Sequence, residues 1–131
     1  MTDRLIPAPI GPSAEFYAFL ARGELRLQRC TACGEWRHPP RIRCAACSST
    51  EVAWEHASGR ATLFSWTVTH RPVDPAFTPP YVIAIAALDE GPRLVGNVRG
   101  IEPDQLTLDL PLAVEIEPVS DSIGFLWFRP A

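Results

Sequence analysis

Four cysteines, arranged as two C-x-x-C pairs, are the residues of this chain best suited to chemistry. Cys30 and Cys33 form the first pair, and Cys44 and Cys47 form the second. They are all the cysteines that the 131-residue chain contains. Each tight turn can direct two thiolates at one ion, so the spacing predicts a tetrahedral zinc site with four sulfur ligands. Four thiolates leave no open position for water on the metal, and the predicted site is therefore structural.

Two other uses of four cysteines stay open on the sequence alone. Two disulfides would need an oxidising compartment, whereas the N-terminal sequence has no apolar run typical of a secretion signal. A rubredoxin-like iron site has the same ligands, and geometry does not distinguish iron from zinc. Zinc is the preferred prediction, and iron is the alternative metal. Gly34, directly after the first pair, fits a turn that needs a residue at positive φ.

The rest of the chain offers no recognisable catalytic set. The sequence contains three histidines and no lysine, and it has no phosphate-binding glycine loop, G-x-S-x-G or H-E-x-x-H motif. His38 is close enough to the cysteines to be considered as a ligand, but four thiolates already complete the coordination sphere. Asp89 and Glu90 fall in a predicted hairpin turn, where solvated carboxylates are expected. We therefore expect a protein that does not catalyse a reaction on its own.

Charge is distributed unevenly along the chain, although the formal net charge is only −3. Residues 20–47 contain six arginines and two glutamates, whereas residues 48–131 contain eleven acidic residues and five arginines. The basic segment surrounds the cysteines and could receive a partner that carries phosphate groups. Nucleic-acid binding is less consistent with the acidic remainder and the absence of lysine, because phosphate neutralisation dominates such affinity.

A short helix is predicted upstream of the cysteines. It begins near Ser13, whose side chain can cap the first turn, and ends near Gly23, which suits the left-handed position after a helix. A helix of about ten residues is marginal by itself, so its aromatic face must pack on the chain's own core or on a partner subunit. That face comprises Phe16, Tyr17 and Phe19.

Strands account for most of the remaining chain. Alternating residues at 24–28 and the short segment 35–38 predict two strands around the first cysteine pair, as in a zinc ribbon. Five further strands are predicted at 60–69, 81–88, 93–98, 112–117 and 125–129, with a helical turn at 103–106. This order matches the small Greek-key barrel called the OB-fold. The predicted fold is mainly β, with an N-terminal arm and short helix at 1–23, a zinc ribbon at 24–53 and a five-stranded OB-fold barrel at 54–131.

Several of these motifs together resemble the family long labelled domain of unknown function thirty-five, which pairs a rubredoxin-like zinc ribbon with an acyl-CoA-associated OB-fold. The likeness includes residues 23–34 with the first cysteine pair, His38-Pro39-Pro40-Arg41, the second pair, and the terminal Phe128-Arg129-Pro130. It spans nearly the whole chain. One departure is Ala45, where the second cysteine turn of the family often has proline.

The resemblance implies an accessory subunit of an acyl-CoA-processing complex. Members are similar to proteins that assemble with thiolase-superfamily enzymes, including thiolases, acyltransferases and steroid side-chain aldolases, and some bind MaoC-like hydratases. We hypothesise that Arg41 and Arg43, with Arg37 behind them, lie near the CoA phosphates or the partner, and the motif supports Arg41 best. The helix aromatics would then pack on the partner subunit. A free-standing OB-fold that binds acyl-CoA or nucleic acid is the alternative.

No stretch of the sequence predicts a membrane span. The longest apolar run, from Tyr81 to Leu88, has eight residues, whereas a transmembrane helix needs about 20. Together with the lack of a recognisable signal peptide, this leads us to expect a cytoplasmic protein.

Overall fold

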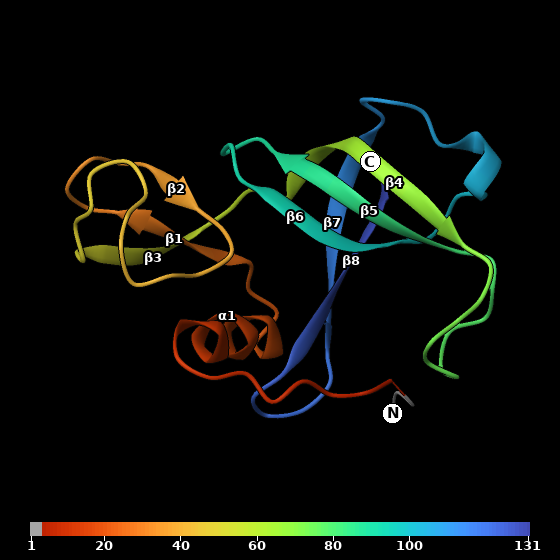
Figure 1. Ribbon diagram of the computed structural model, residues 1–131, viewed down its shortest axis with the longest axis horizontal. Helices are drawn as coiled ribbons and strands as arrows, with labels where there is room; N and C mark the ends of the chain where they lie inside the picture. The colour runs from red at the N-terminus through yellow and green to blue at the C-terminus, as the bar shows by residue number, and fades with distance from the viewer. Residues whose placement is uncertain (1–3) are drawn as a thin grey trace.

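A closed barrel and a small three-stranded sheet, with one helix packed against both, make up the molecule (Figure 1). The computed structural model describes residues 4–131, so the first three residues of the expected N-terminal arm lie outside the described residues. None of the helices in residues 4–131 is long and apolar enough to cross a membrane. The predicted fold class, mainly β with one short N-terminal helix, is confirmed.

Helix α1 spans Pro12–Ala21 and begins differently from the prediction. Gly11 is the N-cap and Pro12 occupies the first helical position, whereas Ser13 lies inside the first turn and does not cap the helix. Proline suits this position because the first N–H group of a helix has no intrahelical acceptor. At the other end Gly23 adopts φ 77°, and its N–H donates to a carbonyl of the last turn, as predicted.

The ribbon sheet consists of three short antiparallel strands. β1 (Arg26–Cys30) lies between β2 (Trp36–Arg37) and β3 (Val52–His56). β1 and β2 agree with the predicted strands around the first cysteine pair. β3 extends the same sheet past the predicted boundary at residue 53, because its whole length pairs with β1. The chain therefore completes the ribbon sheet before it enters the barrel.

Five strands close into the predicted barrel. They follow the order β4-β5-β6-β8-β7, and β7 returns to pair with β4. β6 and β8 are parallel neighbours, and the other neighbouring strands are antiparallel. This arrangement is that of the OB-fold. The strands are β4 (Arg60–Thr69), β5 (Tyr81–Leu88), β6 (Arg93–Val98), β7 (Pro111–Pro118) and β8 (Gly124–Pro130), and the 3-10 turn η1 (Pro103–Gln105) precedes β7.

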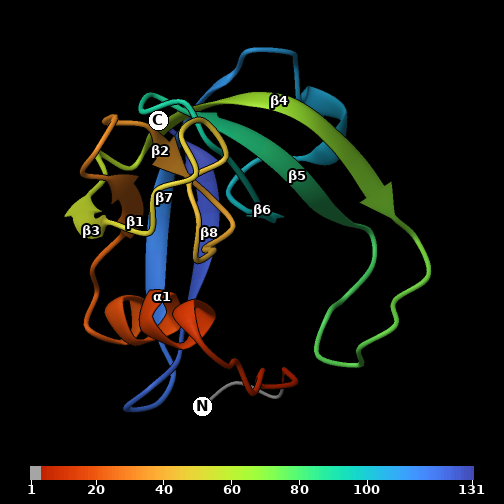
Figure 2. The ribbon, with the colours of Figure 1, turned by 60° about the vertical axis from the view of Figure 1, so that its left-hand side comes forward.

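The β4–β5 hairpin curves strongly and ends in a long loop at residues 70–80 (Figure 2). The register between the two strands shifts between Leu63 and Ser65, so β4 has an extra residue at this point. Such a bulge bends and twists a strand. The loop reaches the N-terminal arm, residues 4–11, where the N–H of Leu5 donates to Asp74 Oδ2 at 3.3 Å.

Helix α1 packs on β8 and on the ribbon, and it joins their cores. Leu20 is 1% exposed and Phe16 is 6% exposed, and both belong to one buried cluster with Leu27 of the ribbon and Phe128 of the barrel. Gly124, at the start of β8, lies directly against the Leu20 carbonyl, where a Cβ atom would overlap it. The ribbon and the barrel therefore share one core instead of folding around two.

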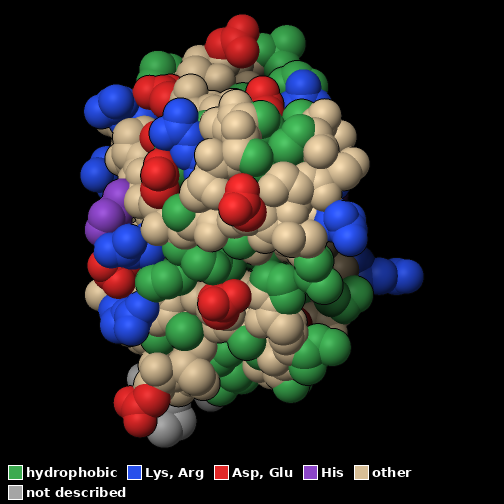
Figure 3. Space-filling model, turned by 90° about the vertical axis from the view of Figure 1, so that its left-hand side faces the viewer, with side chains coloured by type: hydrophobic (Ala, Val, Ile, Leu, Met, Phe, Trp, Pro, Cys, Tyr) green, Lys and Arg blue, Asp and Glu red, His purple; other side chains and the backbone are tan. Residues whose placement is uncertain are grey.

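Ion pairs within the chain neutralise part of the basic segment. Figure 3, which faces the ribbon end of the molecule, shows arginine side chains near both edges of this face with acidic side chains among them. Arg26 pairs with Glu24 at 3.2 Å, and Arg29 pairs with Glu55 at the same distance. The positive charge available to a partner is therefore smaller than the sequence count indicates.

Candidate functional site

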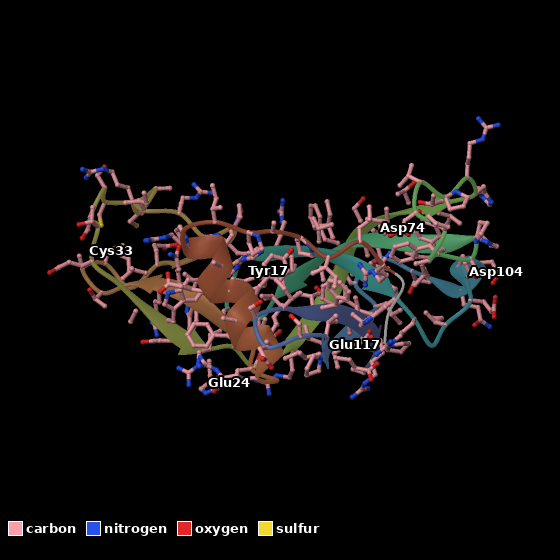
Figure 4. The ribbon with its side chains drawn as sticks, turned by 90° about the horizontal axis from the view of Figure 1, so that it is seen from below. Tyr17, Glu24, Cys33, Asp74, Asp104 and Glu117 are labelled. Carbon is pink, nitrogen blue, oxygen red and sulfur yellow. The ribbon has the colours of Figure 1, made fainter. Side chains whose placement is uncertain are left out.

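The four cysteines meet near the tip of the ribbon, at the opposite end of the molecule from Asp104 (Figure 4). Their Sγ atoms all lie within 4.8 Å of one another, and the Cys30–Cys47 and Cys33–Cys44 sulfur pairs are each 3.6 Å apart. A regular tetrahedron with metal–sulfur bonds of about 2.3 Å has sulfur–sulfur edges of about 3.8 Å. The sulfurs therefore have the spacing needed to hold one tetrahedral ion, as predicted.

Two backbone turns of the same form hold the cysteines. The N–H of Gly34 donates to the Cys30 carbonyl, and the N–H of Ser48 donates to the Cys44 carbonyl, each at 2.9 Å. Gly34 adopts φ 82° and Ser48 adopts φ 66°. The residue after each pair is thus in the left-handed region, as predicted for Gly34, although in the second turn this residue is not a glycine. The backbone itself sets the direction of the ligands.

Backbone hydrogen bonds favour the thiolate form of two of the cysteines. The N–H of Cys33 lowers the pKa of Cys30 to about 6, although desolvation acts in the opposite direction. The N–H groups of Cys47 and then Ala46 lower the pKa of Cys44, and the Ala46 nitrogen lies 3.4 Å from its Sγ. A metal binds thiolates and not thiols. These donors therefore suit sulfur ligands.

Crowding has the opposite effect on the other two thiols. The N–H of Glu35 lowers the pKa of Cys33, but desolvation and the neighbouring Cys44 outweigh this effect. Together they raise the pKa of Cys33 to about 12. The pKa of Cys47 is also raised, although a backbone N–H from Ser49 opposes the rise. Four thiolates at this spacing repel one another, so all four ionise together only around a cation. The donor set fits a bound metal ion.

A buried clamp holds the loop between β2 and the second cysteine pair. Arg37 is 7% exposed, and it donates through Nε to Gln28 Oε1 and through Nη2 to the Arg41 carbonyl, both at 2.9 Å. Gln28 Oε1 also accepts the backbone N–H of Arg41 at 2.8 Å. Arg37 and Gln28 therefore position the backbone of Arg41. The alternating pattern of β1 places Gln28 on the outer face and does not reveal this role.

The three arginines predicted to lie near CoA or a partner differ in availability. Arg37 is inside the fold and does not present its guanidinium at the surface. Arg43 is exposed, and its Nη1 donates to the Ser48 carbonyl at 2.9 Å. The exposed side chain of Arg41 makes no hydrogen bond or ion pair with any described residue. Arg41 is therefore the candidate that the fold leaves most available.

The helix aromatics predicted to dock on a partner are partly used inside the chain. Phe16 is buried, and its ring centroid lies 4.8 Å from that of His38. Phe19 is half-buried against Trp54 with a centroid separation of 5.4 Å, and Tyr17 is half-buried with its ring edge on Phe16. The burial of Phe16 removes it from the predicted docking face. That face is reduced to the outer parts of Tyr17 and Phe19.

His38 lies between α1 and the ribbon and not at the metal centre. The cluster of metal-ligating side chains comprises the four cysteines and does not include His38. Desolvation lowers the pKa of His38 to about 4. Its Nδ1 is buried without a hydrogen-bond partner in the described part of the chain. The imidazole is therefore held in its neutral form.

We expect His38 to make stability depend on pH between about 6.5 and 4. The unfolded chain takes up the proton below its ordinary pKa of about 6.5, whereas the folded chain resists protonation down to about 4. The free energy of unfolding should therefore fall as the pH is lowered through this window, by up to about 3 kcal/mol. Because acid also weakens metal binding, the measurement compares wild type with His38→Phe in denaturant titrations at each pH. Equal pH slopes for the two proteins would contradict this expectation.

The ribbon and the barrel each match a family model. Residues 18–53 match the model described as "ChsH2, rubredoxin-like zinc ribbon domain", and residues 54–117 match "ChsH2, C-terminal OB-fold domain". A solved structure described as the Ltp2-ChsH2(DUF35) aldolase is similar with a TM-score of 0.88 and 35% identity, covering 95% of this chain and 98% of that chain. This chain belongs to the DUF35 family. The family resemblance inferred from the sequence motifs is confirmed.

Two curated relatives are much longer than this DUF35 chain. A probable enoyl-CoA hydratase alpha subunit from Thermomonospora curvata is 36% identical over 125 residues, which is 95% of this chain. The 3-oxo-4,17-pregnadiene-20-carboxyl-CoA hydratase alpha subunit from Mycobacterium tuberculosis is 34% identical over 121 residues, which is 92% of this chain. Each match covers 39% of the relative, so the DUF35 chain spans well under half the length of these subunits.

Proposed function

We propose that this chain is a non-catalytic accessory subunit that assembles with a thiolase-superfamily enzyme and helps to form its acyl-CoA site. The partner would be a thiolase, an acyltransferase or a steroid side-chain aldolase. The observation that carries the proposal is the similarity of this chain, over 95% of its length, to a chain of the structure described as the Ltp2-ChsH2(DUF35) aldolase, of which 98% is covered. The metal centre supports an accessory role, because four thiolates leave no open position at which a substrate could bind.

In this assembly the partner supplies the nucleophile or base, and the DUF35 chain supplies positive charge and a docking surface. Arg41 contacts the CoA phosphates or the partner, and the exposed Arg43 lies two positions farther along the same loop. Arg37 acts indirectly, by holding the Arg41 backbone. Tyr17 and Phe19 on α1 pack against the partner.

Arg41→Ala should weaken acyl-CoA binding by the complex without unfolding the chain. A hydrogen bond to a charged group contributes about 1.5–3 kcal/mol, so loss of one such contact should weaken affinity by about 10- to 100-fold. The melting temperature should stay unchanged because the side chain is exposed. Titration with acyl-CoA and KM measurements on the complex test this, with Arg71→Ala in the 70–80 loop as the matched control. Unchanged assembly, affinity and turnover in Arg41→Ala would exclude the proposed role.

We propose zinc as the metal, with iron as the alternative. The description of the matching family model as a zinc ribbon supports zinc, whereas its rubredoxin-like character keeps iron in consideration. Elemental analysis of freshly purified protein should give one zinc per chain and a colourless solution. A stoichiometric amount of iron, with the visible absorption of an iron–thiolate centre, would instead select the alternative.

A MaoC-like enoyl-CoA hydratase is a second candidate partner. It is favoured by the two hydratase alpha subunits, in which a region similar to this chain makes up 39% of the length. The two partner classes differ in chemistry, since a hydratase adds water to an enoyl thioester and the thiolase-type enzymes make or break carbon–carbon bonds. Assays of both reactions on the isolated complex distinguish them.

A free-standing binder of acyl-CoA or nucleic acid is the third candidate, and nucleic-acid binding is the less well supported of the two. Ile83 and Val95, at outward positions of β5 and β6, are exposed and apolar. A nucleic-acid surface on these strands would instead need cationic side chains to neutralise the phosphates. We expect the chain to work in the cytoplasm, where thiols stay reduced and available to a metal.

A further inference from the structure

A largely apolar pocket lies between α1, the ribbon loop and the barrel. Its volume is about 390 Å³, which falls in the range of small-molecule sites. Its walls include Tyr17 of α1, His38 of the ribbon loop, Ile83 and Val95 of the barrel sheet, and Phe77 of the 70–80 loop. A shallower groove over β4, β5 and β6 continues from it and shares Ile83 and Val95. The two hollows therefore adjoin at these two side chains.

Contacts between the N-terminal arm and the 70–80 loop hold one side of this pocket together. The guanidinium carbon of Arg4 lies 4.7 Å from the ring centroid of Phe77 and 4.1 Å from that of Phe125 on β8. The N–H of Leu5 donates to Asp74 in the same loop, and Figure 4 shows Asp74 toward the end of the molecule that lies opposite Cys33. The arm, the loop and β8 are therefore connected around the pocket.

The polar side chains among the residues that line the pocket are those of Arg4, Tyr17, His38, Tyr81 and Asn97. Asn97 donates through Nδ2 to the Val82 carbonyl at 3.0 Å, and its Oδ1 makes no hydrogen bond with any described residue. The Nδ1 atom of His38 is also without a hydrogen-bond partner in residues 4–131. A cavity whose walls are mainly aromatic and aliphatic, with a few polar groups among them, suits a ligand that is largely hydrophobic and carries polar groups.

The exposed Arg41 follows a residue that lines the pocket. His38 precedes Arg41 by three residues, and three residues span at most about 11 Å. A ligand with an apolar end in the pocket and an anionic end near Arg41 would use both surfaces. We infer, on the basis of the proposed function, that this pocket receives the hydrophobic acyl chain of a CoA thioester whose phosphates lie toward Arg41.

Calorimetric titration of the purified chain with CoA, acetyl-CoA and octanoyl-CoA tests the inference without a partner protein. Each methylene that enters the pocket should increase affinity about two- to fourfold, so octanoyl-CoA should bind at least about tenfold more tightly than acetyl-CoA. Free octanoate distinguishes the acyl chain from the nucleotide end. It should compete with octanoyl-CoA, and it should not compete with CoA.

Val95→Trp should fill the pocket from a position that is 64% exposed, so the fold should be retained. This variant should lose the dependence of affinity on chain length and keep the wild-type affinity for CoA. Leu108→Trp, at a position that is 69% exposed and away from the pocket, is the matched control and should behave like wild type. Amide NMR shifts should locate octanoyl-CoA at Tyr17, His38 and Gly96, which line the pocket.

Three results would overturn the inference: no binding of any of these compounds, no gain from acetyl to octanoyl, or full chain-length dependence in Val95→Trp. These outcomes are separate from those that test the accessory role. Chain-length dependence in the titrations, combined with failure to recover any partner enzyme with the chain from its native lysate, would leave the pocket assigned and the accessory role refuted. Recruitment of a thiolase-type enzyme without chain-length dependence would do the reverse.

Discussion

Removal of the metal should unfold the ribbon and destabilise the whole chain. Structural zinc contributes about 10–16 kcal/mol to the folding of zinc-finger peptides, whereas a typical domain is stable by only about 5–15 kcal/mol. The ribbon sheet has strands of five, two and five residues, which cannot form an independent core. The loss should extend beyond the ribbon, because Phe16 and Phe19 of α1 pack on His38 and Trp54 of the ribbon segment.

Thermal unfolding followed by circular dichroism, with and without a chelator, measures this loss. Cys44→Ser should reproduce the effect of chelation, and Ala45→Ser, next to it in the same turn, should melt like wild type. Restoring the metal should restore the transition in the chelated protein and not in Cys44→Ser. We also expect the metal-free chain to release its partner. Unaltered melting and assembly after complete metal removal would contradict this expectation.

Gly124→Ala should destabilise the fold by about 3 kcal/mol or more, because it separates α1 from β8. The added Cβ would overlap the carbonyl carbon and oxygen of Leu20, and backbone atoms of a helix cannot rotate aside as a flexible side chain can. Overpacking of this kind typically costs about 1–3 kcal/mol when side chains yield, and a shift of α1 also exposes Leu20 and Phe16.

Denaturant titration gives the free energy of unfolding for Gly124→Ala. Ser122→Ala lies two residues away at an exposed position and adds no atom to the side chain, so it serves as the control. A lower midpoint with an unchanged slope is expected for Gly124→Ala alone. If this variant were as stable as wild type, α1 could not be docked on β8 as described.

Local signals explain why the metal site and the barrel strands could be predicted. All four ligands lie in two short turns that are close in sequence, so their meeting requires little of the remaining fold. The strand Tyr81–Leu88 is an apolar run that ends at the polar turn Asp89-Glu90-Gly91, and the structure places it at these residues. The start of α1 was harder to predict, because serine is common as the N-cap of a helix and proline is common at its first position. In the structure Pro12 takes the first position, so Ser13 lies inside the helix and does not cap it.

Long-range contacts decided what could not be predicted. β3 pairs with β1 across more than twenty residues, and no local pattern indicates this pairing. Gln28 is buried because Arg37 and the Arg41 backbone converge on its side-chain oxygen, which a period-two pattern cannot show. The pocket combines residues from both ends of the chain, from Arg4 to Leu126. Such a site exists only once the barrel, the helix and the arm are assembled.

Affinity purification of the tagged chain from its native lysate, with mass spectrometry of the bound proteins, tests the accessory role most directly. We expect a thiolase-superfamily enzyme in near-stoichiometric amount, retained by the wild-type protein and lost after metal removal. A hydratase in the same amount would instead support the second candidate partner. Recovery of the chain alone, or with nucleic acid, would contradict the accessory role.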